Sequence, residues 1–301
     1  MKFNELRYVV ALAKEGNFSR AAEACGVSQP TLSVAIARIE EELGIQLFER
    51  GKNFVSPSDA GHKVVEQARV VLEELEKVKQ LAQSGKDQLE GPLRLGVIHT
   101  IAPYMLPQMI QGLRLIAPNM PLIIEENMTT HLASLLQDNE IDVAIIALPF
   151  EGKDVVTLPV YDEHFELIVP ADHDWAQRKH IKSEEVKGEE VLVLKAGNCF
   201  RDQVLDACSN LSGPDTDIRQ AHSIGTIRCM VSSGLGISVL PQSANQGPYR
   251  NPLVKVIPFE SPAPTRRVAL AWRTSFVRPK AIDALVAAIR TLDPQVFKRL
   301  V

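Results

Sequence analysis

Two of the four cysteines in this chain, Cys199 and Cys208, stand nine positions apart in one short segment. Four cysteines in 301 residues are too few for a disulfide scaffold. In a reducing compartment such thiols are buried packing groups, metal ligands or redox groups. For an isolated pair, two inert buried thiols are the commoner case. The chemistry of the pair therefore depends on the elements that position it.

The residues around Cys199 favour a reactive thiol. Val191–Leu194 has the composition of a strand, residues 195–198 that of a loop, and Arg201–Cys208 that of a helix. Cys199 would then lie at or near a helix N-terminus, where the helix dipole and the free N–H groups favour the thiolate. Arg201, and Arg266 from a distant strand, could add positive charge.

The spacing of the two cysteines also has a geometric consequence. If the positions between them are mostly helical, their Cα atoms lie about 13 Å apart. A disulfide tolerates a Cα separation of only about 4.4–6.8 Å. The helix must therefore unfold or shift for the bond to close, so that oxidation could rearrange the subunit.

The N-terminal part has the pattern of a helix-turn-helix. Helices are expected at residues 4–16, at 19–25, and from a cap at Ser28 to about residue 43, with a Gly-containing turn before Ser28. Residues 48–55 have the pattern of a hairpin that forms a wing beside the helices. Such a unit is typical of DNA-binding proteins.

A long helix is expected from Ser58 to Gln83. Its apolar residues recur at alternating steps of four and three, as in a coiled-coil seam, so we expect it to dimerise. It could instead lie on its own domain, which the dense Glu and Lys between the apolar positions make the weaker interpretation. The seam consists of Val64, Ala68, Val71, Leu75, Val78 and Ala82. Gly91-Pro92 marks the following domain boundary.

From residue 92 onward, short apolar runs alternate with helical stretches. The expected strands are Leu93–Ile98, Leu122–Glu126, Val143–Leu148, Phe165–Val169, Val191–Leu194, Ile237–Leu240, Leu253–Ile257 and Val268–Trp272. Such runs indicate parallel sheets covered by helices. We expect two α/β subdomains with a cleft between them, subdomain I at about 92–162 and 268–301 and subdomain II at about 163–267. The expected domains are thus 1–58, a linker helix and hinge at 59–91, and an effector domain at 92–301.

Composition limits the class of protein. The hydrophobic share is 45% and the charged share 23%, as in ordinary globular proteins. No apolar run could span a bilayer, and the first residues lack the layout of a signal peptide, so we expect a cytoplasmic protein with no membrane partner. The net charge of -4 argues against indiscriminate nucleic-acid binding. Any DNA contact must come from a local surface.

Several motifs resemble those of the LysR-type transcriptional regulators. They are Phe18-Ser19-Arg20-Ala21-Ala22, Val27-Ser28-Gln29-Pro30-Thr31-Leu32-Ser33, Ile39-Glu40, Leu43-Gly44, Leu47-Phe48-Glu49-Arg50, and Gly234-Leu235-Gly236-Ile237-Ser238-Val239-Leu240-Pro241. The resemblance covers the whole chain. It implies an all-α winged helix-turn-helix, a long linker helix, and an α/β effector domain like a periplasmic binding protein. It also implies a homo-oligomer, typically a tetramer, that binds promoter DNA and acts on RNA polymerase.

The expected recognition helix offers suitable groups to DNA. With Leu32, Ile36 and Ile39 turned inward, the outward residues Gln29, Thr31, Ser33 and Val34 would reach base edges. Ser28 and Pro30 begin the helix. Arg20, Arg38, Arg50 and Lys52 suit phosphate contacts. The alternative is an ordinary solvated face, and because acidic and basic residues nearly balance over residues 1–61, charge does not decide between them.

The segment from Asn198 to Cys208 resembles the redox segment of the hydrogen peroxide-sensing OxyR subfamily, whose members control oxidative-stress genes. That resemblance makes Cys199 the peroxidatic thiol and Cys208 the resolving one, reset by a glutaredoxin- or thioredoxin-type reductant. It places Thr100, Thr129, Asp202 and Arg266 around the peroxide. The subfamily usually has histidine where this chain has Asn198, which cannot titrate near neutral pH. Peroxide sensing should survive, with a changed rate and pH dependence.

Other features and functions complete the expectations. Cys25 and Cys229 lie in apolar helical stretches and are expected to be structural. The seven histidines are scattered, and we expect no metal, no cofactor and no enzymatic activity. One alternative is a LysR regulator that responds to a small metabolite in the inter-subdomain cleft. Another is a thiol peroxidase that uses the same cysteines.

Overall fold

The structure is a computed structural model that describes residues 1–51, 54–84, 88–186, 189–207 and 218–300. The chain divides into two compact units, Met1–Gly85 and Lys86–Val301. Lys52 and Cys208 lie outside the described residues.

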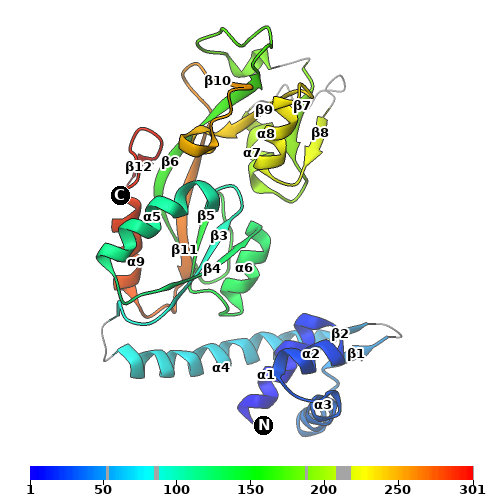
Figure 1. Ribbon diagram of the computed structural model, residues 1–301. Coiled ribbons are helices and arrows are strands. Elements are labelled where there is room, and N and C mark those ends of the chain that lie inside the picture. The colour runs from blue at the N-terminus through cyan, green and yellow to red at the C-terminus, as the bar shows by residue number, and fades with distance from the viewer. Residues whose placement is uncertain (52–53, 85–87, 187–188, 208–217, 301) are drawn as a thin grey trace. The chain divides into compact units, whose positions relative to one another are not determined.

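The first unit contains the predicted helix-turn-helix and hairpin. Its elements are α1 (Phe3–Glu15), α2 (Phe18–Cys25), α3 (Gln29–Leu43), β1 (Phe48–Arg50), β2 (Val55–Pro57) and α4 (Asp59–Ser84) (Figure 1). Side-chain caps define the helix starts: Asn17 accepts hydrogen bonds from the N–H groups at the start of α2, and Ser28 does so at the start of α3. Gly26 ends α2 with a φ of 69°, a left-handed conformation that favours glycine.

The long helix α4 is confirmed, and its first turns belong to the core of this unit. Val65 and Ala68 are buried, and α4 contacts α1. Farther along the seam Val78 is 63% exposed. The N-terminal turns of α4 thus lie on their own domain, which was the alternative interpretation, whereas Val78 is exposed and accessible to another partner.

The second unit is built on a large mixed sheet. Ten strands are joined in the order β4-β3-β5-β11-β6-β9-β7-β8, with β10 and β12 also paired to β6. The strands are β3 (Leu93–Ile98), β4 (Leu122–Asn127), β5 (Val143–Ala147), β6 (Val155–Pro170), β7 (Val191–Leu194), β8 (Ile218–Ala221), β9 (Ile237–Pro241), β10 (Val254–Pro258), β11 (Thr265–Arg273) and β12 (Lys298–Arg299). The helices are α5 (Ala102–Ile116), α6 (Thr129–Gln137), α7 (Cys199–Ala207), α8 (Ile224–Ser232) and α9 (Pro279–Ile289), with short turns η1 (Ser183–Glu185), η3 (Gln242–Asn245) and η4 (Gly247–Tyr249).

The expectation of parallel sheets holds for only part of this sheet. β3 is parallel to β4 and β5, and β7 is parallel to β8 and β9, as the alternation of strands and helices predicts. By contrast, β11 runs antiparallel to both β5 and β6, and β6 runs antiparallel to β9 and β10. The reason is that β6 carries the chain from one half of the unit to the other and β11 carries it back, so the two strands run in opposite directions.

Two separate clusters of buried side chains lie along this sheet. The first is formed by β3, β5, α5, α6 and α9 and includes Tyr161 and Val268. The second is formed by β7, β9, α7 and α8 and extends from Phe165 to Phe259. The strand β6 contributes to both, because its first half pairs with β11 and its second half with β9 and β10. We refer to the regions around the first and second clusters as subdomains I and II.

Candidate functional site

Cys199 is the first residue of α7, as the sequence predicts. The loop that leads to it follows β7, and Gly197 takes a φ of 93° there, in the left-handed region. The side chain of Asn198 accepts a hydrogen bond from the N–H of Phe200 at 3.1 Å. This is the geometry of a helix cap, so Asn198 fixes the start of α7.

The thiol of Cys199 lies at the boundary between the two subdomains. The side chain is partly buried and packs against the core of subdomain I, although Phe200 next to it belongs to the core of subdomain II. The hydroxyl of Thr129, the first residue of α6, donates a hydrogen bond to Cys199 Sγ at 3.3 Å. The sulfur therefore contacts subdomain I, while the residue next to it belongs to the core of subdomain II.

A buried ion pair lies on the far side of Phe200. Arg266 Nε donates to Glu163 Oε2 at 2.8 Å, and both side chains are completely buried. Two further nitrogens of Arg266 donate to the hydroxyl and the carbonyl of Thr100, each at 2.9 Å. The guanidinium lies 5.4 Å from the centre of the Phe200 ring. Because β11, β6 and the loop after β3 supply its members, this network joins distant parts of the chain.

Glu163 was not identified from the sequence, and it changes the interpretation of Arg266. We expected Arg266 to add positive charge near the thiol, but the buried carboxylate of Glu163 compensates that charge. The other oxygen of Glu163 accepts a hydrogen bond from the N–H of Ser243 at 2.8 Å. Glu163 lies just before the expected strand Phe165–Val169, and no local signal in the sequence indicated its pairing with Arg266.

The expected peroxide-binding residues fall into three groups. Thr129 contacts Cys199 directly, and Thr100 contacts Arg266. Asn198 caps α7. Asp202, in contrast, has a side chain that is 65% exposed and lies 3.8 Å from Arg201. In this conformation Asp202 faces solvent, because the first turn of α7 directs it away from the subdomain boundary.

The helix α7 is tied to subdomain I at a second point. Gln203 Nε2 donates to the carbonyl of Leu148 at the end of β5, at 3.0 Å. Together with the contact between Thr129 and Cys199, this bond holds one face of α7 against subdomain I. Since α7 is helical from Cys199 to Ala207, those Cα atoms lie about 12 Å apart. Cys208 follows Ala207 outside the described residues, so its pairing with Cys199 stays a prediction.

The two remaining cysteines differ from each other. Cys25 packs against the core of the first unit, and burial raises the pKa of its thiol. Cys229 is exposed, which does not fit the expectation of a structural thiol. The reason is that the buried face of α8 is formed by Ile224, Ile227 and Val231, and Cys229 lies off that face.

The exposed residues of α3 match the expected DNA-reading set. Gln29, Pro30 and Thr31 are exposed and Ser33 is half-buried. Val34 is 69% exposed, so its side chain is accessible to a thymine methyl group. The hydroxyl of Ser28 already has hydrogen-bond partners within the protein, because it caps α3 at the N–H of Thr31 and lies 2.7 Å from the Thr31 hydroxyl.

The three described arginines of the expected phosphate-binding set all have acidic neighbours. Arg20 lies 3.8 Å from Glu15, Arg50 lies 3.3 Å from Glu40, and Arg38 contacts the buried carboxylate of Glu5. At least half of each arginine side chain is nevertheless exposed. These contacts fix the arginines in place and leave their outer surfaces available to an anion.

The described residues offer neither a membrane-spanning helix nor a metal-binding cluster. None of their helices is both long enough and apolar enough to cross a membrane. None of their His, Cys, Asp and Glu side chains form a group of three or more that could hold a metal ion.

Comparisons with known proteins place these features in a family. A profile described as "LysR substrate binding domain" matches residues 86–293, and one described as "Bacterial regulatory helix-turn-helix protein, lysR family" matches residues 3–62. The chain is 38% identical to the hydrogen peroxide-inducible genes activator of Dickeya chrysanthemi, over 91% of this chain and 90% of that protein. It is 36% identical to the DNA-binding transcriptional dual regulator OxyR of Escherichia coli K12, over 96% and 95% of the two chains.

Solved structures agree with this placement. Full-length OxyR of Pseudomonas aeruginosa, a cysteine-to-aspartate variant, is 48% identical and superimposes with a TM-score of 0.78 over 96% of this chain and 95% of that one. A cysteine-to-serine variant of Corynebacterium glutamicum OxyR with hydrogen peroxide bound is 32% identical, with a TM-score of 0.65 over 96% and 92% of the two chains.

Proposed function

Because the chain belongs to the LysR family of transcriptional regulators, within its OxyR group, we propose that it activates genes of oxidative-stress defence when hydrogen peroxide oxidises Cys199. The observation that carries this proposal is the position of the Cys199 sulfur. It lies at the start of a helix, at the boundary of two subdomains, and accepts a hydrogen bond from Thr129.

The proposed chemistry has two steps. The Cys199 thiolate attacks one oxygen of hydrogen peroxide, the O–O bond breaks, and the departing hydroxide takes a proton and leaves as water. Cys199 is now a sulfenic acid. The Cys208 thiolate then attacks the Cys199 sulfur and displaces a second hydroxide, which gives a disulfide. The peroxide gains two electrons and the cysteine pair loses two, which a dithiol reductant of the glutaredoxin or thioredoxin type later restores.

The disulfide requires local refolding. Its Cα atoms must lie within about 6.8 Å, whereas α7 keeps Cys199 about 12 Å from the residue before Cys208. Unwinding of α7 would break the hydrogen bond from Thr129 to Cys199 and that from Gln203 to Leu148. Both bonds join the subdomains, so their loss is the proposed signal.

The DNA-binding part follows from the family and from the exposed surface of α3. We assign residues 1–58 to promoter recognition, with Gln29, Thr31, Ser33 and Val34 at base edges and Arg20, Arg38, Arg50 and Lys52 at phosphates. Residues 59–91 would join two subunits, and residues 92–301 would sense peroxide. The protein would act as a homotetramer in the cytoplasm, contact RNA polymerase, and perform no sustained catalysis.

Mass spectrometry after one equivalent of peroxide tests the chemistry. The parent protein should contain an internal crosslink between Cys199 and Cys208, whereas Cys208→Ser should stop at a sulfenic acid on Cys199. The exposed Cys229 serves as the internal comparison, because accessibility alone would oxidise it first. Modification of Cys229 with Cys199 left as a thiol would contradict the proposal.

The hydrogen bond from Thr129 gives a quantitative prediction. Thr129→Val keeps the shape of the side chain and removes the hydroxyl, and a hydrogen bond to a charged group is worth enough to slow the oxidation of Cys199 about tenfold. Stopped-flow oxidation under pseudo-first-order peroxide would measure the rate. Thr130→Val, at the exposed neighbouring position, is the matched control and should react like the parent. Equal rates for the two variants would refute a role for Thr129.

A further inference from the structure

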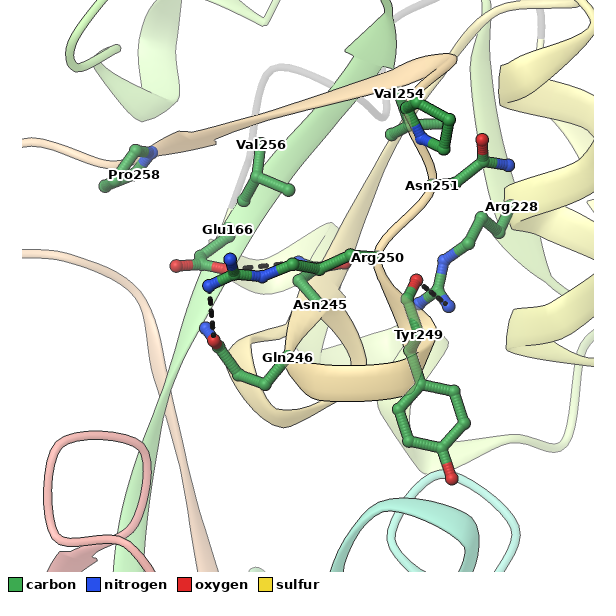
Figure 2. A pocket seen from close by; sticks show the side chains of 11 residues that line it. Glu166, Arg228, Asn245, Gln246, Tyr249, Arg250, Asn251, Val254, Val256 and Pro258 are labelled. Atoms are coloured by element: carbon green, nitrogen blue, oxygen red, sulfur yellow. Dashed lines mark hydrogen bonds between the residues drawn. The ribbon is translucent and has the colours of Figure 1, made fainter.

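A cavity of about 600 Å³ lies within subdomain II, separate from the Cys199 site (Figure 2). It is formed by β6, α8, β10 and the segment that connects η3 to β10. Its lining residues are Glu166, Arg228, Asn245, Gln246, Tyr249, Arg250, Asn251, Pro252, Val254, Val256 and Pro258. The volume falls in the range of small-molecule sites, and the proposed peroxide chemistry uses none of these residues.

One wall of the cavity carries a buried carboxylate. Glu166 is only 7% exposed, and its Oε2 accepts a hydrogen bond from Asn245 at 3.0 Å. Among the described residues, its other carboxylate oxygen has no hydrogen-bond partner. Burial raises the pKa of Glu166, which the hydrogen bond from Asn245 and the charge of Arg250 partly oppose. A buried carboxylate with one free oxygen is an acceptor for a cationic group.

Two arginines line the same cavity. Arg228 is committed to the protein, because it donates to the carbonyl of Tyr249 at 2.8 Å and to that of Ala244. Arg250 is exposed, and its contact with Gln246 is long at 3.4 Å. Figure 2 shows the Arg250 side chain extending toward Gln246, with a dashed line between the two side chains. Arg250 is therefore the group that can bind an anion.

The remaining walls are apolar. Val254, Val256, Pro252 and Pro258 line the cavity, and Val256 is 40% exposed. An aliphatic group placed there would remove this surface from water, which is favourable. The cavity thus combines an acceptor for a cation, a donor for an anion and an apolar wall.

We propose that this cavity binds a free aliphatic amino acid, with its ammonium on Glu166, its carboxylate on Arg250 and its side chain against Val254 and Val256. This binding claim stands independently of the proposed peroxide function.

The cavity is connected to the network behind Cys199. Asn245, which holds Glu166, belongs to the turn whose Ser243 N–H binds Glu163, the partner of Arg266. On the other side, the Tyr249 hydroxyl donates to the carbonyl of Pro103 in subdomain I at 2.7 Å, and its ring packs against Tyr104. An occupant would therefore contact residues that hold the two subdomains together. We therefore expect the bound ligand to change the rate at which peroxide oxidises Cys199, an expectation that rests on the proposed function.

Binding of L-leucine to the reduced full-length protein tests the site, with isothermal titration calorimetry and ligand-observed NMR as the measurements. Two analogues each lack one charge: N-acetyl-L-leucine has no ammonium, and 3-methylbutylamine has no carboxylate. Each should bind about tenfold more weakly than L-leucine, since each loses a charge-assisted hydrogen bond. If L-leucine shows no binding at about 10 mM, which corresponds to negligible affinity, or if the analogues bind equally well, the proposal is wrong.

Variants locate the binding. Glu166→Gln keeps the shape of the side chain and removes its charge, and Arg250→Ala removes the exposed guanidinium, so each variant should bind L-leucine about tenfold more weakly. Glu260→Gln, an exposed position outside the lining, is the matched control and should bind like the parent. If Glu166→Gln and Arg250→Ala both bind L-leucine like the parent, the ligand binds at another site and the proposal is wrong. Peroxide oxidation of Cys199 is measured in the same samples. Normal oxidation without leucine binding would refute only the ligand site, and leucine binding without oxidation would refute only the proposed function.

Discussion

Replacing Cys199 by serine is expected to leave promoter binding intact and to reduce peroxide-induced transcription to the uninduced level. A serine hydroxyl does not form the anion that attacks peroxide at neutral pH, whereas a thiol does. The hydroxyl can still accept the hydrogen bond from Thr129, so the resting structure of α7 should persist. A promoter reporter in a host without its own peroxide regulator would measure induction, and gel-shift titration would measure binding.

The other thiols provide the controls. Cys229→Ser removes an exposed thiol and Cys25→Ser a partly buried one, and both variants should respond to peroxide like the parent. Full induction in Cys199→Ser would favour a regulator that responds to a metabolite. Continued consumption of peroxide by the parent with excess thiol reductant, far beyond one equivalent per subunit, would favour a thiol peroxidase.

Replacing Glu163 by glutamine is expected to cost about 3–5 kcal/mol of unfolding free energy, because it leaves the Arg266 guanidinium buried without its counter-ion. Both side chains are completely buried and lie 2.7 Å apart. The same variant should alter the reaction of Cys199 with peroxide, since Arg266 lies against Phe200 next to the thiol. Equilibrium unfolding in urea, followed by tryptophan fluorescence and circular dichroism, would measure the loss.

The neighbouring ion pair is a matched control for this measurement. Asp162 and Arg267 lie 2.8 Å apart, one position from Glu163 and Arg266 on the same two strands, but Arg267 is half-exposed. The hydrogen bond from Arg267 lowers the pKa of Asp162, so this pair stabilises the fold above the usual pKa of the carboxyl and loses its effect as the pH falls. Because solvent screens it, Asp162→Asn should cost less than about 1 kcal/mol. Similar losses in the two variants would show that burial does not set the energy of the Glu163 pair.

The sequence predicted most of the elements of the fold, but not the full extent of β6 or the antiparallel direction of β11. The strands β5 and β7 are continuous apolar runs, because both of their faces are covered. The first half of β6 was not predicted, since Pro159, Asp162 and Glu163 interrupt its apolar pattern. The antiparallel direction of β11 depends on which strands it meets, and those partners lie more than a hundred residues earlier in the chain.

The part of the site formed by residues adjacent in the sequence could be predicted. Cys199 at the start of a helix follows from the residues on either side of it, and Asn198 takes the place of a cap. Glu163 could not be paired with Arg266 from the sequence, because 103 positions separate them and 166 separate Arg266 from Thr100. The direction of Asp202 depends on how α7 is rotated against subdomain I, which the contact from Gln203 to Leu148 sets. The local sequence pattern therefore identifies Cys199 as the reactive residue, whereas the residues that surround it depend on tertiary packing.

The strand β6 runs without interruption through both subdomains, over residues 155–170. Its pairing with β11 ends at His164 and its pairing with β9 begins at Phe165, so the two subdomains share one backbone strand while each keeps its own partner strands. A bend between these two positions would leave both sets of backbone hydrogen bonds in place. Covalent continuity along β6 therefore keeps the subdomains connected whatever happens to α7.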